Sequence, residues 1–433
     1  MKVAFYTLGC KVNQYETNGM IQEFKKEGYE IVDFSEKADI YIVNTCTVTS
    51  MSDRKSRQIL RRTKELNPSA IVVAVGCYAQ VGKENLKAIP EIDLILGTNE
   101  KSKMIDYIEE FKEDNIKKEV ISDVMQDKKF DEFGEVTYTD KTRAVIKVQD
   151  GCDRFCTYCI IPYARGRVRS RNFESVIKEV ESISKQGIKE VVITGIHVAS
   201  YGKDFKEDIG LIDLLEKINE IEGIERIRLG SLEPTLITEK FLERLSKLNK
   251  ICHHFHLSLQ SGCDETLKRM NRKYSVEEFE NVVKLLRNTY QDVILTTDII
   301  VGFPGETEEE FNKTYEFLKR IKFYKMHVFK YSPRRGTKAA EMKNQIEPKI
   351  KDERSKKLIE LSNKNQEEEN IKYVGKELRV LFEEKENEYI KGHTSNYIMV
   401  KAKGDKSELN KILKVEINGN DNEQLIGIIN EGK

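Results

Sequence analysis

Three cysteines stand close together near the middle of the chain, in the segment RAVIKVQDGCDRFCTYCIIPYARGRVRSR (143–171). Cys152, Cys156 and Cys159 follow the spacing C-x3-C-x2-C, and three thiolates so close together can hold a metal centre. A structural zinc ion needs four protein ligands, and the next histidine is only His197, so zinc is the weaker alternative. Three thiolates on a four-iron cluster leave one iron open, and an open iron binds a substrate or cofactor directly.

The same spacing, with the aromatic Tyr158 before the last cysteine, resembles the signature of radical S-adenosylmethionine (SAM) enzymes. The resemblance implies that the amino and carboxylate groups of SAM chelate the open iron. It also implies that one electron from the cluster cleaves SAM and yields a 5′-deoxyadenosyl radical. Such a radical can remove hydrogen from C–H bonds that are too inert for deprotonation by a protein base.

Three further cysteines, Cys10, Cys46 and Cys77, each follow the end of an apolar run that predicts a strand. In open α/β sheets the carboxyl edge of the strands is where ligands bind, so the three thiols are expected to converge there. The alternative is three separate buried thiols, because free cysteine is commonly buried. Strand and helix alternate, which predicts a parallel sheet covered by helices, with strands at 2–7, 39–45 and 71–76 and helices at 13–26 and 52–66.

The motifs LGCKVNQYET (8–17), VNTCTVT (43–49) and VGCYAQ (75–80) resemble the three cysteine motifs of radical SAM methylthiotransferases. In that family these cysteines hold an auxiliary [4Fe-4S] cluster that delivers sulfur. The residues KVNQYET and TVTSMSDRKSRQ resemble the branch that modifies N6-threonylcarbamoyladenosine in tRNA. The branches that act on isopentenyladenosine in tRNA and on a ribosomal-protein aspartate are the alternatives.

The middle of the chain alternates strand and helix patterns six times, which predicts a partial (β/α)6 barrel. Its strands are expected at 144–149, 189–194, 225–230, 255–260, 293–299 and 327–331. The cysteine loop follows the first strand, at the carboxyl rim where such barrels place chemistry. Residues on this rim are candidates to bind SAM, with ordinary packing or turn formation as the alternative, and they are Tyr158, Gly195, Glu233, Ser258, Gln260 and Gly302. The turn at 302–305 is predicted to lead into a helix with Glu306 in its first turn.

Four arginines, Arg165, Arg167, Arg169 and Arg171, occupy every second position after the central cysteines. In an extended strand all four guanidinium groups would face one way. Such a row suits tRNA phosphates, or the SAM carboxylate for one of them, and a solvated edge strand is the alternative. The helix after Cys46 is also basic, which fits either phosphate contact or a solvated face, and its cations are Arg54, Lys55, Arg57, Arg61, Arg62 and Lys64.

Two other groups of residues give weaker signals. His254 and His256 alternate on a predicted strand, but no third ligand for a metal is evident. Cys252 and Cys263 repeat neither cysteine spacing and are predicted to be packed or surface thiols.

A long charged helix is predicted at about 348–373, with Ile350, Leu358 and Leu361 on its apolar face. After this helix the sequence pattern changes from helical to strand-like. Short alternating strands with Gly and Asn turns predict a small antiparallel barrel. In methylthiotransferases a TRAM domain, which binds tRNA, holds this position, and this segment resembles one less sharply than the cysteine regions resemble theirs. A stabilising appendage is the alternative to RNA binding through Lys391, His393, Tyr397 and Lys401.

Composition limits the remaining choices. Lys+Arg and Asp+Glu balance at 73 each, so any nucleic-acid site must be a local patch. The longest apolar runs are far short of a membrane span, and the N-terminus has no signal-peptide shape, so a cytoplasmic protein without a membrane partner is expected. Residues 118–140 are predicted to be a linker. The expected division is 1–125 for an N-terminal methylthiotransferase domain, 141–370 for a radical SAM barrel and 371–433 for a TRAM-like RNA-binding domain.

The resemblance implies a transferase that adds a methylthio group to C2 of the adenine in N6-threonylcarbamoyladenosine at position 37 of tRNA. It implies two [4Fe-4S] clusters and two SAM molecules per turnover. One SAM methylates sulfur at the auxiliary cluster, and the other is cleaved so that the radical takes the hydrogen from C2. An electron donor such as flavodoxin or ferredoxin is implied, whereas the sulfur donor and any catalytic residue beyond the cluster ligands stay open. A noncatalytic iron–sulfur, RNA-binding redox protein is the alternative from another class.

Overall fold

The computed structural model describes residues 1–134, 136, 142–421 and 423–430. Its N-terminal part is a six-stranded sheet in the order β2-β1-β3-β4-β5-β6, with all neighbours parallel. β3 and β4 are almost wholly buried, as parallel strands covered on both faces must be. The elements of this part are β1 (Lys2–Thr7), α1 (Lys11–Lys26), β2 (Glu30–Val32), β3 (Ile40–Thr45), α2 (Ser50–Leu66), β4 (Ile71–Gly76), α3 (Cys77–Val81), α4 (Lys83–Lys87), β5 (Leu94–Leu96), the 3-10 turn η1 (Lys101–Lys103), α5 (Met104–Asp114) and β6 (Lys118–Val120).

β6 corrects the prediction that a linker begins at residue 118. This strand pairs in parallel with β5 and extends the sheet by one strand, although its polar sequence carries no apolar period. Beyond it, Val124, Phe133 and Val136 are buried against the rest of the chain. Residues 135 and 137–141 of the predicted linker lie outside the described residues.

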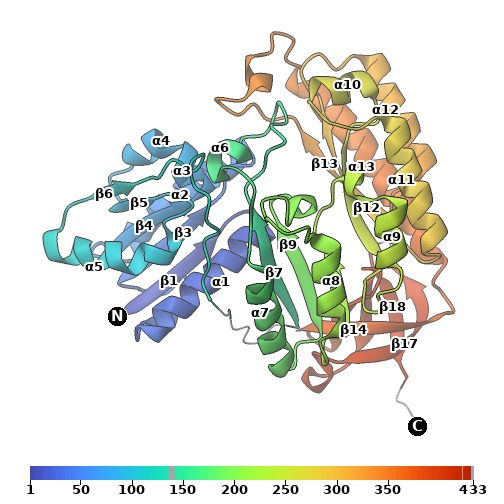
Figure 1. Ribbon diagram of the computed structural model, residues 1–433, viewed down its shortest axis with the longest axis horizontal. Helices are drawn as coiled ribbons and strands as arrows, with labels where there is room; N and C mark the ends of the chain where they lie inside the picture. Colours follow the sequence, from blue (N-terminus) through green and yellow to red (C-terminus); the bar gives the residue numbers. More distant parts are fainter. Residues whose placement is uncertain (135, 137–141, 422, 431–433) are drawn as a thin grey trace.

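The central part is an open arc of parallel strands, which confirms the predicted partial barrel. β7, β9 and β10 form one sheet, and β11, β12 and β13 form another. Two isolated parallel bridges, Ile227 with Ile251 and Leu232 with Leu257, connect the segments around β10 and β11. Figure 1 shows helices on the outer side of this arc. The strands are β7 (Arg143–Asp150), the short antiparallel β8 (Arg169–Ser170), β9 (Glu190–Gly195), β10 (Arg226–Leu229), β11 (His254–Gln260), β12 (Ile294–Val301) and β13 (Lys325–Lys330).

The helices of the arc lie between these strands in the chain, except that α13 follows the last of them. The apolar faces of α7, α8, α11 and α12 are buried in the same core cluster as the strands. These helices and turns are α6 (Ile161–Arg165), α7 (Phe173–Lys185), η2 (Val198–Ser200), α8 (Leu211–Glu220), η3 (Pro234–Leu236), α9 (Glu239–Leu245), α10 (Asp264–Arg269), α11 (Val276–Thr289), α12 (Glu308–Ile321), η4 (Lys338–Glu341) and α13 (Pro348–Ile371). Leu358 and Leu361 of α13 are buried, as predicted, whereas Ile350 is only half-buried.

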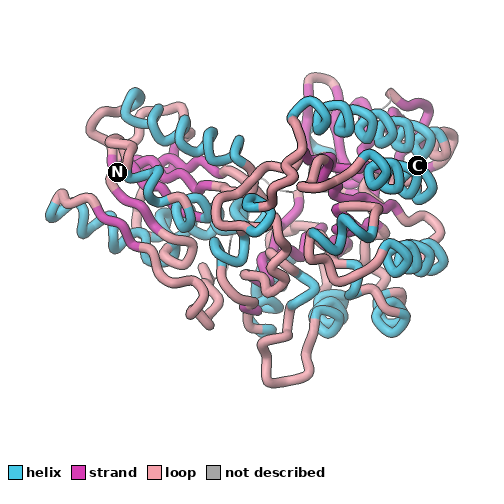
Figure 2. Tube along the Cα trace, turned by 90° about the horizontal axis from the view of Figure 1, so that it is seen from above, coloured by secondary structure: helices cyan, strands magenta, loops and turns pink. Residues whose placement is uncertain are grey.

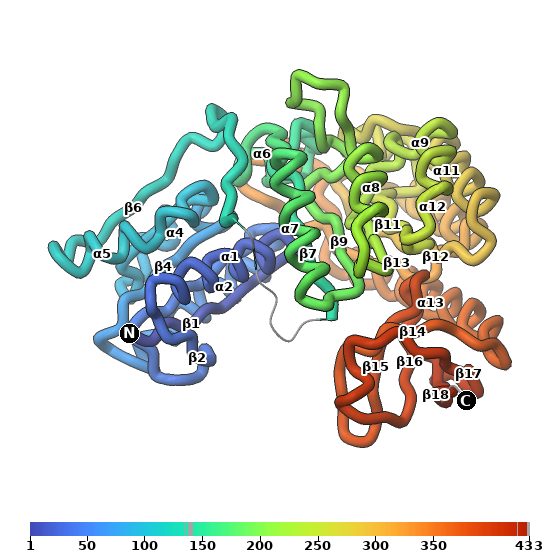
Figure 3. Tube along the Cα trace, turned by 60° about the horizontal axis from the view of Figure 1, so that its bottom comes forward, coloured from blue at the N-terminus to red at the C-terminus, as the bar shows by residue number. Residues whose placement is uncertain are grey.

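The C-terminal part is a closed five-stranded barrel in the order β14-β15-β16-β18-β17. The predicted small barrel is confirmed, but one of its pairs, β16 with β18, is parallel rather than antiparallel. Figure 3 shows the barrel below the arc and beside α13. Its elements are β14 (Glu377–Glu386), β15 (Tyr389–Thr394), β16 (Met399–Lys403), η5 (Lys406–Glu408), β17 (Ile412–Asn420) and β18 (Leu425–Ile429).

The N-terminal sheet meets the arc through α1, which contacts both β1 and β7. Figure 2, seen from above, shows loops gathered between the two parts and helices on either side of them. A second contact joins Arg334, in the loop after β13, to Asp53 in the first turn of α2, with a nitrogen–oxygen distance of 2.6 Å. No helix among the described residues is long and apolar enough to cross a membrane.

Candidate functional site

The first cysteine trio lies at the carboxyl edge of the N-terminal sheet. Thr45 of β3 pairs with Gly76 of β4, so Cys46 and Cys77 come directly after paired residues. Cys10 lies three residues after the end of the neighbouring β1 and directly precedes α1. Cys10 lies close enough to both Cys46 and Cys77 to raise the pKa of each thiol, in addition to the larger effect of burial. The topology therefore brings residues from three distant points of the chain to one edge.

Asn13 and Gly9 hold the turn that carries Cys10. The Asn13 amide nitrogen donates to the carbonyl oxygens of Leu8 at 2.7 Å and Thr45 at 3.1 Å, which ties this turn to the end of β3. Gly9 has a φ of 101°, and a Cβ atom there would lie 2.8 Å from Sγ of Cys46. Only glycine combines this backbone conformation with so close an approach.

The second trio lies on the loop between β7 and α6. The backbone N–H of Arg154 donates to Sγ of Cys152, and the N–H of Cys159 donates to the carbonyl oxygen of Cys156. The Thr157 hydroxyl donates to the carbonyl oxygen of Arg269, the last residue of α10, and its N–H donates to that of Met270. Just beyond them, Asn271 donates to the carbonyl oxygen of Phe155. The loop is thus fixed by a part of the chain more than a hundred residues away.

Short helix α6 connects the two trios. It begins two residues after Cys159 and ends at Arg165, whose Nε donates to Sγ of Cys77 at 3.1 Å. Figure 1 shows α6 between α3 and the arc. One thiol of each set, Cys159 and Cys77, therefore lies near an opposite end of this short helix.

Buried charges surround this helix. Arg165 donates to Glu16 of α1 at 2.7 Å and to Asp150 of β7 at 3.1 Å. Lys101 and Lys147 also pair with Glu16, each at 2.8 Å. Burial alone would raise the pKa of Glu16, but the three cations outweigh it and hold that pKa well below its usual range. We call Glu16, Lys101, Lys147, Asp150 and Arg165 the interface charge cluster.

The predicted row of four arginines is wrong. Arg165 ends a helix, and only Arg169 lies in the two-residue strand β8, so the segment does not have the continuous period of two on which the prediction depends. Arg165, Arg169 and Arg171 are at most 1% exposed. Arg171 pairs with Glu179, and Arg169 lies near Asp150. Arg167 is half exposed, and its guanidinium group stacks on the Phe155 ring at 4.9 Å.

Glu233 is the centre of a polar cluster beside the central cysteine loop. It pairs with Arg154 and accepts a hydrogen bond from Nε2 of His197 at 2.9 Å, and Arg272 lies 3.9 Å away. Arg272 also donates to Sγ of Cys156 at 3.3 Å and to the carbonyl oxygen of Ser258 at 3.1 Å. Burial alone would raise the pKa of Glu233, but these partners hold it below its usual value. The cluster links two predicted SAM-binding residues, Glu233 and Ser258, to the cysteines.

The other predicted rim residues have more local partners. Gly195 approaches Gln149 of β7, where a Cβ atom would lie 2.9 Å from the Gln149 carbonyl oxygen. Tyr158 packs against Phe303, with ring centroids 6.4 Å apart. Gln260 has a φ of 71° beyond a register shift in β11, so it does not continue the simple alternation predicted for it and Ser258. Whether these residues bind SAM stays a prediction.

The turn at 302–305 differs from its predicted role. α12 begins at Glu308 with Thr307 as its N-cap, so Glu306 precedes the helix. Glu306 accepts hydrogen bonds from the Gly302 N–H and from Arg354 of α13, both at 2.6 Å. The turn is therefore locked onto α13.

The remaining sequence candidates have these positions. Arg54, Lys55, Arg61 and Arg62 on α2 are exposed, whereas Arg57 donates to the Tyr78 hydroxyl and Lys64 to Asp93. Cys252 and Cys263 are packed in the interior. Lys401 lies over the Tyr389 ring. Phosphate binding by the α2 cations stays a prediction.

Sequence reasoning missed Glu16, Arg154 and Arg272. Glu16 lies in the motif KVNQYET, and Arg154 lies between two of the cysteines. Their positions inside the cysteine motifs could have identified both as candidate site residues. Arg272 carried none, because its approach to Cys156 depends on how the segment after α10 folds over the loop.

The donor sets fit iron–sulfur clusters. Burial raises the pKa of Cys77 and Cys152 to about 11 and that of Cys159 to about 12, so metal binding must displace protons from these thiols. Arg165 and Arg272 touch one thiol of each trio and would offset the negative charge of bound thiolates. In the described part of the chain no three His, Cys, Asp or Glu side chains are arranged around a single ion. A cubane spreads its thiolates over separate irons, so that finding concerns single ions only.

Replacement of Gly9 by alanine should disturb the first trio specifically. The new Cβ atom would press on Cys46, so after anaerobic reconstitution we expect iron to fall from about eight to about four per chain. Iron analysis and the visible absorption of the cluster measure this. Gly28→Ala is the matched control, because Gly28 has a φ of 80° with no atom within 4 Å of an added Cβ. Equal iron loss in both variants would contradict the assignment.

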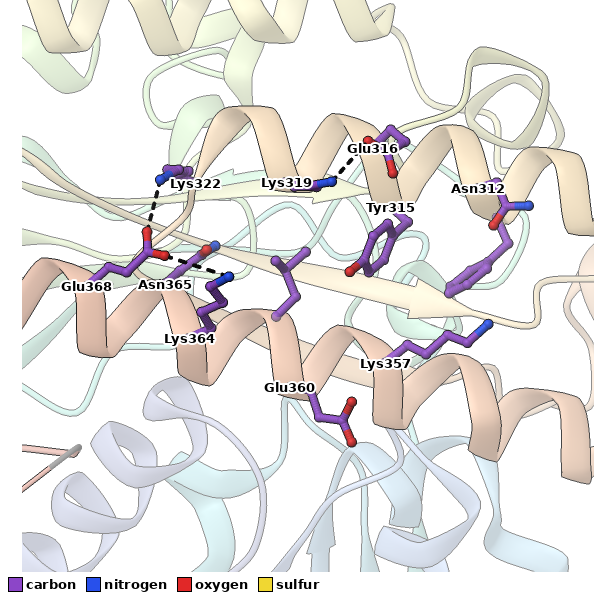
Figure 4. Close-up of a pocket in the computed structure, with 12 residues that line it drawn as sticks. Asn312, Tyr315, Glu316, Lys319, Lys322, Lys357, Glu360, Lys364, Asn365 and Glu368 are labelled. Atoms are coloured by element: carbon purple, nitrogen blue, oxygen red, sulfur yellow. Dashed lines mark hydrogen bonds and ion pairs between the residues drawn. The ribbon is translucent and has the colours of Figure 1, made fainter.

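Besides a cavity of about 510 Å³ against the N-terminal sheet, two cavities among the described residues are large enough for a ligand and adjoin the arc. One, of about 610 Å³, is a groove between α12 and α13 on the outer surface (Figure 4). Its charges pair with one another, as in Lys322–Glu368 at 2.9 Å, and no cysteine is among the residues that line it. The other, of about 700 Å³, lies between the arc and the C-terminal barrel and includes Lys11, which directly follows Cys10. We call this second cavity the lumen cavity.

Comparison with known proteins defines the class first. Residues 146–318 match the model of the Radical SAM superfamily, and residues 2–97 match that of Uncharacterized protein family UPF0004. The radical SAM methyltransferase TsrM from Kitasatospora setae shares the fold, with a TM-score of 0.57 and 17% identity over 76% of this chain and 72% of TsrM. The partial barrel, its cysteine loop and the superfamily match make the chain a radical SAM protein, which carries a [4Fe-4S] cluster and uses SAM.

Sequence identity to known proteins shows which family of radical SAM proteins the chain belongs to. The chain is 44% identical to threonylcarbamoyladenosine tRNA methylthiotransferase MtaB of Bacillus subtilis, over 96% of this chain and 93% of that protein. It is 45% identical to MtaB of Aquifex aeolicus, over 96% and 100%. Identity to tRNA-2-methylthio-N(6)-dimethylallyladenosine synthase of Clostridium tetani is 37%, over 95% and 92%. The chain belongs to the tRNA methylthiotransferase family, and the predicted resemblance to its threonylcarbamoyladenosine branch is confirmed.

Proposed function

We propose that the protein converts N6-threonylcarbamoyladenosine at position 37 of tRNA into its 2-methylthio derivative. The observation that carries the proposal is the 44–45% identity, over nearly the whole chain, to two enzymes named for threonylcarbamoyladenosine tRNA methylthiotransfer. The 37% identity to a dimethylallyladenosine synthase makes that substrate the second candidate. A protein that acts on tRNA in this way works in the cytoplasm.

The roles proposed for the cysteines follow from their positions. Cys152, Cys156 and Cys159 would hold the cluster that binds SAM, and Cys10, Cys46 and Cys77 would hold an auxiliary cluster. Bound SAM supplies a methyl group for sulfur and, in a second molecule, the radical that removes hydrogen from C2 of the adenine. The proposed sulfur-carrying part is residues 1–125. The part proposed to form the radical is residues 141–370, and the proposed RNA-binding part is residues 371–433. An external reductant such as flavodoxin or ferredoxin is proposed as electron donor.

The chain's own side chains keep these two sites in place. Arg272 spans from Cys156 to the carbonyl oxygen of Ser258, so it fixes the cysteine loop relative to the rim of the arc. Glu233 is buried and held by His197 and Arg154, which suits a hydrogen bond to an amine or a ribose. Arg165 joins Cys77 to the arc through Asp150. These contacts tie the loop of the second trio and the strand edge of the first trio to the arc.

Nucleoside mass spectrometry tests the proposal. In tRNA from cells that lack this protein, we expect the 2-methylthio-threonylcarbamoyl nucleoside to be absent and the unthiolated precursor to accumulate. Return of the gene should restore the nucleoside. Loss of 2-methylthio-isopentenyladenosine instead would identify the second substrate.

Anaerobic reconstitution separates the enzyme from a noncatalytic redox protein. The enzyme should bind about eight irons per chain and form 5′-deoxyadenosine from SAM when dithionite is added. A protein that binds iron and RNA but leaves SAM intact would support the noncatalytic alternative. A tRNA product that is thiolated on neither adenosine would direct attention to the ribosomal-protein branch.

A further inference from the structure

The lumen cavity extends from the amino end of β11 to Gly230 and Ser231, just past the carboxyl end of β10, and it meets the first cysteine trio through Lys11, which directly follows Cys10. Its wall is built from β10 to β13 of the arc, from the C-terminal barrel and from Lys11 of α1. Along β11, His254, His256 and Ser258 alternate on one face, so His254 lies about 13 Å along the strand from Ser258. The Ser258 carbonyl oxygen bonds to Arg272, which touches Cys156. The chain from Ser231 to Glu233 therefore leads from the cavity wall to the polar cluster beside the central cysteine loop.

The Tyr397 ring of the C-terminal barrel lines the cavity, and neighbouring side chains stack on it. The His254 ring stacks on it at a centroid distance of 4.7 Å, and the His393 ring stacks on it at 4.4 Å. The Arg228 guanidinium group lies 4.5 Å from the same ring. These contacts hold Arg228 and His254 in fixed positions on the cavity wall.

Arg228 presents an unused donor to this wall. The residue is 1% exposed, and it donates through Nε and Nη2 to Glu190 at 2.7 and 3.2 Å. Its Nη1 has no hydrogen-bond partner among the described residues. Lys11 adds a second cation, since no hydrogen bond or ion pair engages its ammonium group within the described chain. The cavity therefore offers two cationic donors to an anion.

His254 presents an unused acceptor. His256 donates from Nε2 to Asp298 at 3.2 Å, so its Nδ1 accepts from the Thr296 hydroxyl at 3.0 Å. That hydroxyl oxygen in turn accepts from Nε2 of His254 at 3.0 Å, which leaves Nδ1 of His254 as an acceptor. Nδ1 of His254 has no partner among the described residues, and the residue is 6% exposed.

We propose that the lumen cavity binds the threonyl end of the threonylcarbamoyl group, a role that rests on the proposed function. Arg228 and Lys11 bind its carboxylate, and Nδ1 of His254 accepts a hydrogen bond from its hydroxyl. A dimethylallyl group has neither feature and would leave these buried groups unpaired. A site built for hydrogen bonds rejects an analogue that lacks them, so these residues set the choice of substrate.

Binding of anticodon stem-loop RNAs to the cluster-loaded protein tests the proposal. The probes differ only at the adenosine: one carries threonylcarbamoyl, one its methyl ester, and one glycylcarbamoyl, which lacks the hydroxyl and its side chain. Since charge-assisted hydrogen bonds are the strong ones, the protein should prefer the carboxylate over the ester by about 10- to 100-fold. Arg228→Gln should abolish this preference. His254→Phe keeps the stacking and should lose the preference for threonyl over glycyl.

Lys11→Gln keeps the proposal testable if Arg228→Gln fails to fold, because Lys11 is exposed. It should reduce the preference for the carboxylate about 10-fold. Lys25→Gln, at the exposed far end of α1, removes the same charge and should leave the preference unchanged. Undiminished preference in Lys11→Gln, or in Arg228→Gln where that variant folds, would overturn the proposal. If the unchanged protein thiolates none of the RNAs in the presence of SAM and dithionite, it is the proposed function that fails.

Discussion

Replacement of Cys156 by alanine is expected to abolish both SAM cleavage and methylthiolation, whereas Cys46→Ala should abolish methylthiolation and leave SAM cleavage measurable. The two cysteines belong to separate trios, each with one thiol near an end of α6, so the loss of one trio leaves the other's ligands in place. Loss of a ligand should reduce the affected step by more than about 100-fold, since loss of an outer partner of a metal ligand already costs about 10- to 100-fold.

Formation of 5′-deoxyadenosine and of methylthiolated nucleoside, measured on the same reconstituted sample, separates the two effects. Cys263→Ser is the matched control, because Cys263 is a buried thiol that donates to Glu265 and a serine hydroxyl can do the same. It should retain both activities. Methylthiolation by Cys46→Ala would show that the first trio has another role.

The parts of the fold that depend on local pattern could be predicted from the sequence. Cys46 and Cys77 follow buried apolar runs directly, and in a parallel sheet the ends of such runs meet at one edge. The same reasoning gave the six strands of the arc and the small C-terminal barrel. β6 could not be predicted in this way, because a polar edge strand of three residues has no apolar period.

The partners of charged residues could not be predicted, because they come from distant parts of the chain. Arg165 and Arg171 look like surface cations in the sequence, yet Glu16 and Glu179 neutralise them inside the protein. The sequence predicts that Lys391, His393 and Tyr397 bind RNA, and in the structure these residues line the lumen cavity. The sequence pattern identifies these charged and aromatic residues, but it does not determine which side chains or cavities they face in the folded protein.

Glu16→Ala is expected to destabilise the protein strongly. The residue is 1% exposed, and its removal leaves Lys101, Lys147 and Arg165 with Asp150 as the remaining carboxylate of the interface charge cluster. Removal of one member of a buried ion pair typically costs about 3–5 kcal/mol, because the other charge stays buried without compensation. The cluster joins α1 to β7, so the N-terminal sheet should also separate more readily from the arc.

Denaturant unfolding of the cluster-free protein, followed by circular dichroism, measures this cost without a contribution from bound iron. Glu23→Ala is the control on the same helix: Glu23 forms an exposed ion pair with Lys26, and such pairs contribute at most about 1 kcal/mol. Glu16→Gln distinguishes charge from packing, since the amide fills the same space and keeps an acceptor but carries no charge. If Glu16→Gln is as stable as the unchanged protein, the charge of this carboxylate does not stabilise the three cations, and Asp150 is the carboxylate that compensates them.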